Sequence, residues 1–212
     1  VILGALAQVV PERVPAEGAS CIWNPVFLSA PGEVGSNATS GSFVTNPIFN
    51  GGTGARAAKD GLSTTAFPSG VRTTPTEINE ATAPLVIWRK EYRCDSAGVG
   101  EHRGGLGQVI EIAHAAGGAF VVSKMFDRIN HPARGSRGGG DGAPGKVYVK
   151  DGEVFKGKGR DVVPAGATLV METPGGGGIG QVADRDADQV RADVAAGLVS
   201  VEAACRDYGL DD

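Results

Sequence analysis

Short apolar runs, each bounded by glycine or proline, recur along most of this chain. Runs of this length predict β-strands rather than long helices. Strands are predicted over residues 21–30, 40–49, 85–93 and 167–174. Residues 1–10 are instead apolar and helix-like, and Pro11 stops them, so a short N-terminal helix is expected.

Two further stretches have the pattern of β-hairpins. Residues 108–115 and 118–126 are apolar runs on either side of a small glycine-containing turn. Residues 146–156 centre on Asp151-Gly152, a dipeptide typical of two-residue hairpin turns. The sequence therefore predicts that each stretch folds back on itself as an antiparallel pair.

A short helix is predicted after residue 73. Thr74 can cap the helix, Pro75 suits the first helical position, and Glu77 can close a capping box. Pro84 limits the helix to about two turns, because proline cannot continue an interior helical hydrogen-bond pattern.

The last thirty residues change character and predict two helices. Asp186 resembles an N-cap, with apolar residues at helical spacing after it, and Ser200 begins a second helix that Gly209 ends. Residues 184–212 contain eight acids and three arginines, a net charge of −5. Such an acidic pair is typically a solvated flank whose apolar stripe packs on a sheet.

These elements together predict an α+β fold, mainly antiparallel β with glycine-rich loops, a few short helices and a C-terminal helical pair. We expect a β-rich body over residues 1–183 and a short helical tail over 184–212 packed on it. The composition agrees, since 34 glycines and 12 prolines in 212 residues indicate many tight turns and long ordered loops.

Charge and cysteine content limit the class of protein. A net charge of −4 gives no basic excess for binding nucleic acid, and no apolar run reaches the ~18 residues of a membrane span. The three cysteines are odd in number and far apart, which favours a reducing, cytoplasmic location over a disulfide scaffold.

The stretch 46–70 is the first candidate site. Arg56, Lys59 and Asp60 lie between several glycines, which let the backbone approach a ligand closely. Cations beside exposed backbone N–H groups can hold a carboxylate, carbonyl or phosphate. The alternative is a structural loop whose charges face water.

The stretch 124–146 is the second candidate site. It lacks periodicity, lies between predicted strands, and carries five cations against two acids. Arg128 suits two-point recognition of an anion, and His131 could transfer a proton near neutral pH. A loop that docks a partner would also use these cations. The alternatives are a solvated basic loop, which could pair with the acidic tail, and an ordinary loop histidine.

Two other kinds of site are not predicted. The three histidines show no metal-ligand spacing, so no complete metal site is expected within these residues. Residues 174–180 read PGGGGIG, but they lack the Lys-Ser/Thr of a nucleotide-binding loop, and a tightly packed turn explains them more simply.

Several motifs, in the same order, resemble one known family. They are GGTGAR followed by KDG (51–61), AFPSGVRTTPTEINE (66–80), CDSAGVGEHRGGLGQV (94–109), GGGDGAPGKV (138–147), PGGGGIG (174–180) and the tail 186–210. The chain is similar to the B-type subunit of ATP-dependent hydantoinases, in the hydantoinase B/oxoprolinase family. That family also includes subunits of acetone and acetophenone carboxylases.

The resemblance implies a subunit of a heteromeric hydrolase. An A-type ATPase subunit would use ATP and Mg²⁺ to phosphorylate a cyclic amide or imide, and the B-type subunit would complete the ring opening. The match covers the C-terminal part of longer members, so the N-terminal remainder of the B-type subunit is an expected partner. The divalent metal of the family is expected in that remainder, and no cofactor is expected on this chain.

The site residues expected from these arguments fall into two roles. Asp60 and His131 are the candidate catalytic groups, and Arg56, Lys59 and Arg128 are the candidate substrate-binding groups. Two alternatives stay open, namely a subunit of an ATP-dependent ketone carboxylase and a non-catalytic scaffold module.

Overall fold

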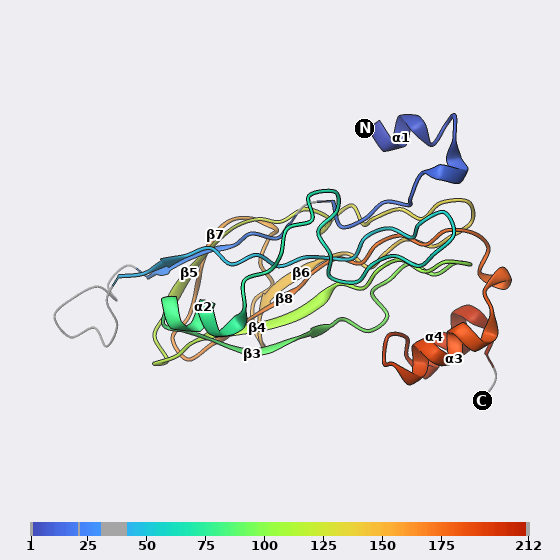
Figure 1. The fold of residues 1–212 in the computed structure, drawn as a ribbon. Helices are drawn as coiled ribbons and strands as arrows, with labels where there is room; N and C mark the ends of the chain where they lie inside the picture. Colours follow the sequence, from blue (N-terminus) through green and yellow to red (C-terminus); the bar gives the residue numbers. More distant parts are fainter. Residues whose placement is uncertain (1, 21, 31–41, 211–212) are drawn as a thin grey trace.

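A computed structural model describes residues 2–20, 22–30 and 42–210, and its β part consists of two four-stranded antiparallel sheets (Figure 1). One sheet has the order β2-β1-β5-β7, with β1 Val26–Ser29, β2 Val44–Thr45, β5 Phe120–Met125 and β7 Lys158–Val163. The other has the order β3-β4-β8-β6, with β3 Leu85–Tyr92, β4 Gln108–His114, β8 Thr168–Glu172 and β6 Lys146–Val149.

The two sheets share one hydrophobic core. Trp23, just before β1, stacks on Phe126 with ring centroids 4.0 Å apart. Ile110 and Ile112 of β4 lie in the same cluster, because alternate residues of that strand are buried. Met171 of β8 is also fully buried there. The mainly antiparallel α+β architecture predicted from the sequence is therefore confirmed.

The hairpin predicted over residues 108–126 is wrong. Both strands form, but β4 pairs with β3 and β8, whereas β5 pairs with β1 and β7. The turn between them carries the chain from one sheet to the other, which lets each strand place its apolar face in the shared core. Local sequence does not distinguish a turn within a sheet from a turn between sheets.

The Asp151-Gly152 turn is confirmed, although its second arm is a single bridge between Tyr148 and Val154. Asp151 has a φ of 57°, and the Gly152 amide donates to the Val149 carbonyl at 2.9 Å, so the chain reverses over Lys150 and Asp151. Strand β7 was not predicted, because five of its six residues lie at least partly in solvent and its sequence gives no apolar pattern.

Six short helical segments complete the described chain. They are α1 Ile2–Leu6, η1 Pro11–Arg13, α2 Thr76–Thr82, η2 Val182–Asp184, α3 Ala187–Ala195 and α4 Val201–Tyr208. The predicted N-caps of the two C-terminal helices are confirmed. Asp186 accepts a hydrogen bond from the Asp188 amide at the start of α3, and Ser200 accepts one from the Ala203 amide at the start of α4. Some positions within predicted elements lie outside the described residues: 1, 21, 40, 41, 211 and 212.

The predicted cap of α2 is wrong. Pro75 occupies the N-cap position, with no side-chain hydrogen bond, so Thr74 does not cap the helix. None of the helices in the described ranges is both long and apolar enough to cross a bilayer.

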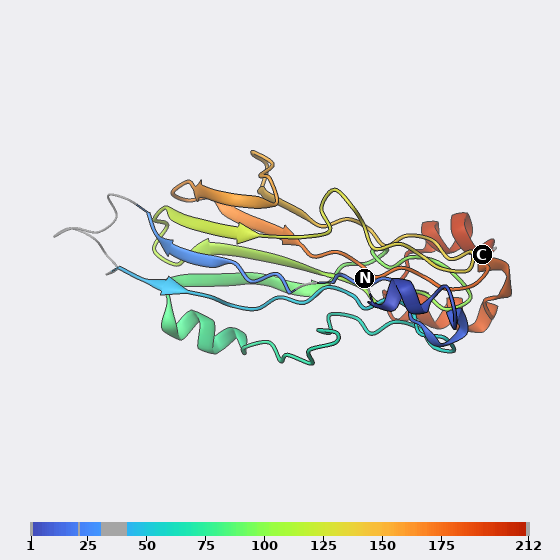
Figure 2. The same cartoon turned by 90° about the horizontal axis from the view of Figure 1, so that it is seen from above.

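Extended glycine-rich segments continue from the sandwich toward the helical pair (Figures 1 and 2). Residues 174–180 are all buried and lie between segments from four other parts of the chain. Gly176 donates to the Gly105 carbonyl at 2.9 Å, and Gly177 donates to the Glu17 carbonyl at 2.8 Å. A Cβ on Gly176 would lie 1.8 Å from the Thr53 carbonyl oxygen, so only glycine fits there.

The helices α3 and α4 have a small core of their own, built from Val190, Val199, Ala203 and Ala204. In Figure 1 they lie on the opposite side of the glycine segments from α1. The division of the chain at residue 183 stays a prediction.

Candidate functional site

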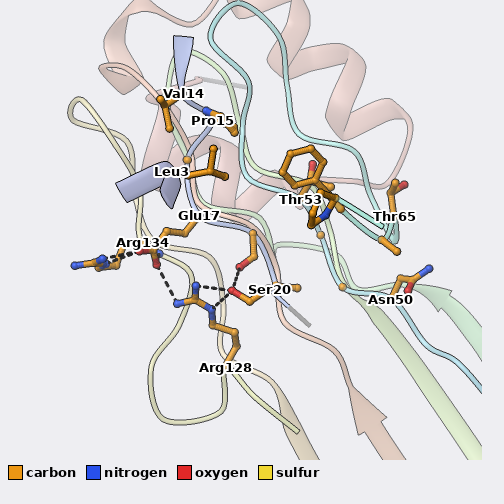
Figure 3. Close-up of a pocket in the computed structure, with 18 of the residues that line it drawn as sticks. Leu3, Val14, Pro15, Glu17, Ser20, Asn50, Thr53, Thr65, Arg128 and Arg134 are labelled. Carbon is orange, nitrogen blue, oxygen red and sulfur yellow. Dashed lines mark hydrogen bonds and ion pairs between the residues drawn. The ribbon is translucent and has the colours of Figure 1, made fainter. Parts of the chain in front are cut away.

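A cleft of about 950 Å³ lies beside the glycine segments (Figure 3). The N-terminal segment, residues 50–53, the turn 65–69 and the loop 128–136 line it. Leu3, Val14 and Phe67 contribute apolar walls, while Glu17 and Arg128 contribute charge. Its size is in the range of small-molecule sites, and its lining combines apolar surface with a few polar groups.

Arg128 is fixed at the edge of this cleft. Its Nη1 donates to Glu17 Oε2 at 2.9 Å, and its Nε and Nη2 donate to Ser20 Oγ at 3.0 and 2.7 Å. The backbone of Arg128 has a φ of 62°, which is uncommon for a residue other than glycine. The loop conformation and these contacts together direct the guanidinium group toward the N-terminal segment.

Arg134 binds the same carboxylate from the other side. Its Nε donates to Glu17 Oε1 at 2.9 Å, and its backbone N–H donates to Oε2 at 3.1 Å. The Arg134 hydrogen bond is the main reason that the pKa of Glu17 falls to about 2, even though partial burial opposes that fall. Glu17 is therefore a carboxylate at neutral pH, shared by two guanidinium groups.

A second, shallower cleft of about 340 Å³ lies where the tail meets the glycine segments. Lys59, Asp60, His102 and Arg185 are among its lining residues. Asp60 accepts hydrogen bonds from Arg185 Nη1 and Nη2, both at 2.9 Å, and from the Arg103 amide at 2.9 Å. Burial would raise the pKa of Asp60, but the Arg185 hydrogen bonds and charge outweigh it and lower that pKa.

Asp193 of α3 completes a network of four charges. Arg103 donates to it through Nε at 2.9 Å and Nη2 at 3.0 Å, and Arg185 Nη2 donates at 2.6 Å. The Arg185 side chain is 1% exposed, and its guanidinium lies 5.8 Å from the centroid of the Tyr208 ring. This network ties α3 and α4 to the glycine segments.

The structure separates the residues that the sequence singled out. Arg128 lines the large cleft, whereas Lys59 and Asp60 line the second one. Arg56 donates through Nε and Nη2 to the Asp60 carbonyl at 3.0 and 2.8 Å and so closes its own turn. His131 is exposed and lines neither cleft. Their proposed catalytic and binding roles stay predictions.

Sequence reasoning missed the partners of these residues. The basic loop was expected to dock an anion or a partner, or else to face water and pair with the acidic tail. Neither reading included Glu17, which pairs with Arg128 and Arg134. Glu17 is an isolated acid in a Pro-Ala-Glu-Gly stretch, and no local pattern connects it to a loop more than a hundred residues away. Arg103 and Asp193 were missed for the same reason.

Within the described residues, no group of three or more His, Cys, Asp or Glu side chains is placed to hold a metal ion. Cys94 is largely exposed, but the partial loss of water around its thiol, together with the neighbouring Asp95, raises the pKa of that thiol. A raised pKa disfavours the thiolate that a cysteine nucleophile requires.

Comparisons with known proteins agree on one family. The sequence pattern of hydantoinase B/oxoprolinase proteins matches residues 1–182. A protein of Pseudomonas sp. (strain NS671), described as the candidate B-type subunit of a D-/L-hydantoinase, is 30% identical over 221 residues. That alignment covers 99% of this chain and 35% of the Pseudomonas protein.

Two solved structures have the same fold. The ATP-dependent caprolactamase from Pseudomonas jessenii aligns with a TM-score of 0.75 and 25% identity over 98% of this chain and 37% of its own. Nucleotide-free acetone carboxylase aligns with a TM-score of 0.76 and 20% identity over 97% of this chain and 32% of its own, a likeness of fold alone. The chain spans about a third of the length of these relatives.

Proposed function

Because this chain belongs to the hydantoinase B/oxoprolinase family, we propose that it is the C-terminal part of a B-type subunit that opens a cyclic amide or imide. The match of the family pattern over residues 1–182 carries this proposal. The fold shared with the ATP-dependent caprolactamase supports it. Similar proteins are named as subunits, so we propose that an A-type ATPase subunit is the partner.

The proposed division of labour follows from the chemistry of amides. An amide carbonyl is a poor electrophile, and phosphorylation of its oxygen by the A-type subunit, with ATP and Mg²⁺, supplies a good leaving group. The B-type subunit then needs to position the activated carbon and stabilise charge during ring opening. The arginines of the large cleft suit the charge-stabilising part of that task.

We do not propose a divalent metal site within this chain. The described residues do not provide a cluster that fits such an ion, and we draw no step through it. We propose that the N-terminal part of the B-type subunit holds it. We also propose a cytoplasmic location for the assembly, because three cysteines, odd in number and far apart in sequence, suit a reducing compartment.

The decisive experiment uses the complete B-type subunit together with its A-type partner. Hydantoin, 5-oxoproline and caprolactam are each supplied with ATP, and ADP and the ring-opened product are quantified. We expect ring opening of at least one substrate that depends on both ATP and both subunits. No ring opening, together with ATP-dependent carboxylation of acetone or acetophenone by bicarbonate, would instead establish the carboxylase alternative.

A second experiment tests the scaffold alternative. Lys59→Ala and Arg56→Ala are made in the complete enzyme, with Lys156→Ala as the control because Lys156 is an exposed lysine outside both clefts. If Lys59 or Arg56 positions substrate, turnover falls at least tenfold while assembly by size-exclusion chromatography is unchanged. Wild-type turnover in both variants, with intact assembly, would favour a scaffold role for this segment.

A further inference from the structure

The charges of the large cleft do not balance. Among the charged residues that line the cleft, Arg128 and Arg134 are two cations and Glu17 is the one anion, a net charge of +1. Asp141 lies outside this lining, where its carboxylate also acts on Arg134. The arginine pair can therefore accept a second negative charge. Planar guanidinium groups recognise carboxylate and phosphate oxygens by paired hydrogen bonds.

Glu17 holds the two arginines in different ways. The side chain of Arg128 is 19% exposed and is also held by Ser20 and by the Pro132 carbonyl. The side chain of Arg134 is 77% exposed, and its side-chain contacts in the described residues all go to Glu17 Oε1. Arg128 is thus a fixed cation, whereas Arg134 is the more exposed of the two and can turn toward a ligand that replaces its bonds to Glu17.

The rest of the cleft suits a small ligand with an apolar body. Figure 3 shows Leu3, Val14 and Pro15 on the side of the cleft away from Arg128. Phe67 also lines the cleft and is 52% exposed. A compact group lying along this apolar wall would direct a charged substituent toward the Glu17–arginine cluster.

We propose that this cleft binds an oxyanion, phosphate or carboxylate, carried by a small ligand, on Arg128 and Arg134. In the absence of a ligand, the Glu17 carboxylate accepts the hydrogen bonds of both guanidinium groups. The ligand oxyanion competes with Glu17 for these hydrogen bonds. This inference rests on the proposed function only for the identity of the ligand. A phosphorylated ring would supply a phosphate, and a ring-opened product would supply a carboxylate.

Anion binding by the 212-residue chain tests the proposal without any turnover assay. Inorganic phosphate and acetate are titrated separately by calorimetry, at constant ionic strength, into the wild type and Glu17→Gln. Because Gln is neutral and a weaker competitor, we expect Glu17→Gln to bind at least one of the two anions about tenfold or more tightly than the wild type. Tighter binding of phosphate alone would indicate the phosphorylated ligand, and tighter binding of acetate alone the ring-opened product.

Matched variants separate this site from general charge effects. Glu91→Gln makes the same charge change at an exposed acid whose partner, Arg89, lies on β3 outside the cleft, and it should leave anion affinity unchanged. Arg134→Gln, at an exposed position that need not affect folding, should weaken binding in the Glu17→Gln background at least fivefold.

Two results would overturn the proposal. One is equal anion affinity in wild type and Glu17→Gln, with both folded by circular dichroism. The other is an equal gain in affinity in Glu91→Gln. Neither result depends on the partner subunit or on ATP, so failure here is distinct from failure of the proposed amidohydrolase activity.

Discussion

Glu17 fastens the N-terminal segment to the loop that carries Arg128 and Arg134. Its carboxylate oxygens accept hydrogen bonds from both guanidinium groups and from the Arg134 amide. Each bond is charge-assisted, which makes it stronger than a neutral hydrogen bond. One residue therefore determines both the charge of the large cleft and the position of one of its walls.

The depressed pKa of Glu17 predicts a pH-dependent contribution to stability. The folded-state pKa of about 2 lies below the ordinary value of 4.5, so the contribution is complete above pH 4.5 and is lost as pH falls toward 2. The side chain is 31% exposed, and solvent screening reduces the expected contribution to about 1–2 kcal/mol.

Urea unfolding of wild type and Glu17→Gln at pH 7, 5 and 3 measures this contribution. We expect the difference in unfolding free energy to be the same at pH 7 and 5, and smaller at pH 3. A difference that grows as the pH falls would contradict the assigned role of the carboxylate.

Buried ion pairs attach the C-terminal helical pair to the rest of the molecule. Its own core contains few large side chains, and its anchor is the network of Asp193 with Arg103 and Arg185. Breaking a buried ion pair by removing one partner is costly, because the remaining charge has left water without compensation. The helical pair should therefore depend on this network more than on its apolar stripe.

Asp193→Asn tests that dependence. We expect the unfolding free energy to fall by about 3–5 kcal/mol. We also expect the substitution to speed amide hydrogen exchange more in α3 and α4 than in the two sheets. Asp188→Asn is the matched control on the same helix, because Asp188 is 87% exposed and its ion pair in the described residues is with exposed Arg191. The control should change stability by about 0.5 kcal/mol or less. Equal effects of the two substitutions would show that the network does not anchor the helical pair.

At the scale of the whole molecule, the glycine-rich segments connect the sandwich to the helical pair. They pack backbone against backbone, and residues 174–180 lie at their centre. Side chains are excluded from such contacts, so the positions of glycine are fixed by distances between segments that are remote in sequence. The clefts lie against these segments and depend on them for their shape.

Gly176→Ala is expected to prevent stable folding. The new Cβ would lie 1.8 Å from the backbone oxygen of Thr53, and a backbone neighbour cannot move aside as a flexible side chain can. A cost above about 4 kcal/mol is expected, in the exceptional range for one substitution.

Gly4→Ala is the control, because nothing lies within 4 Å of the methyl group that this substitution adds in α1. It should leave the melting temperature unchanged or slightly higher, since alanine favours a helix over glycine. Soluble yield and thermal melts followed by circular dichroism compare the two variants. A native-like melt for Gly176→Ala would refute the packing argument.

Local pattern predicted the elements better than it predicted their partners. The Asp186 and Ser200 caps, the Asp151-Gly152 turn and the strand over residues 85–93 were readable because each depends on neighbours in sequence. The pairing of β4 and β5 was misread, because strand partners are chosen by burial in a common core.

In the candidate sites, too, the sequence indicated individual residues but not the partners that they contact in space. Arg128 and Asp60 were identifiable as charged residues in glycine-rich surroundings, and the sequence motifs were enough to indicate the family. Their partners Glu17 and Arg185 were not identifiable, since they lie 111 and 125 residues away along the chain.

By itself, the sequence determined the class of fold, the two C-terminal helices with their N-caps, and the family, because these depend on residues near one another and on motifs that keep their order. Only the tertiary structure decided which sheet each strand joins, which glycines tolerate no side chain, and which acid faces which arginine. Those outcomes depend on distances through space between remote segments, and a linear pattern carries no measure of such distances.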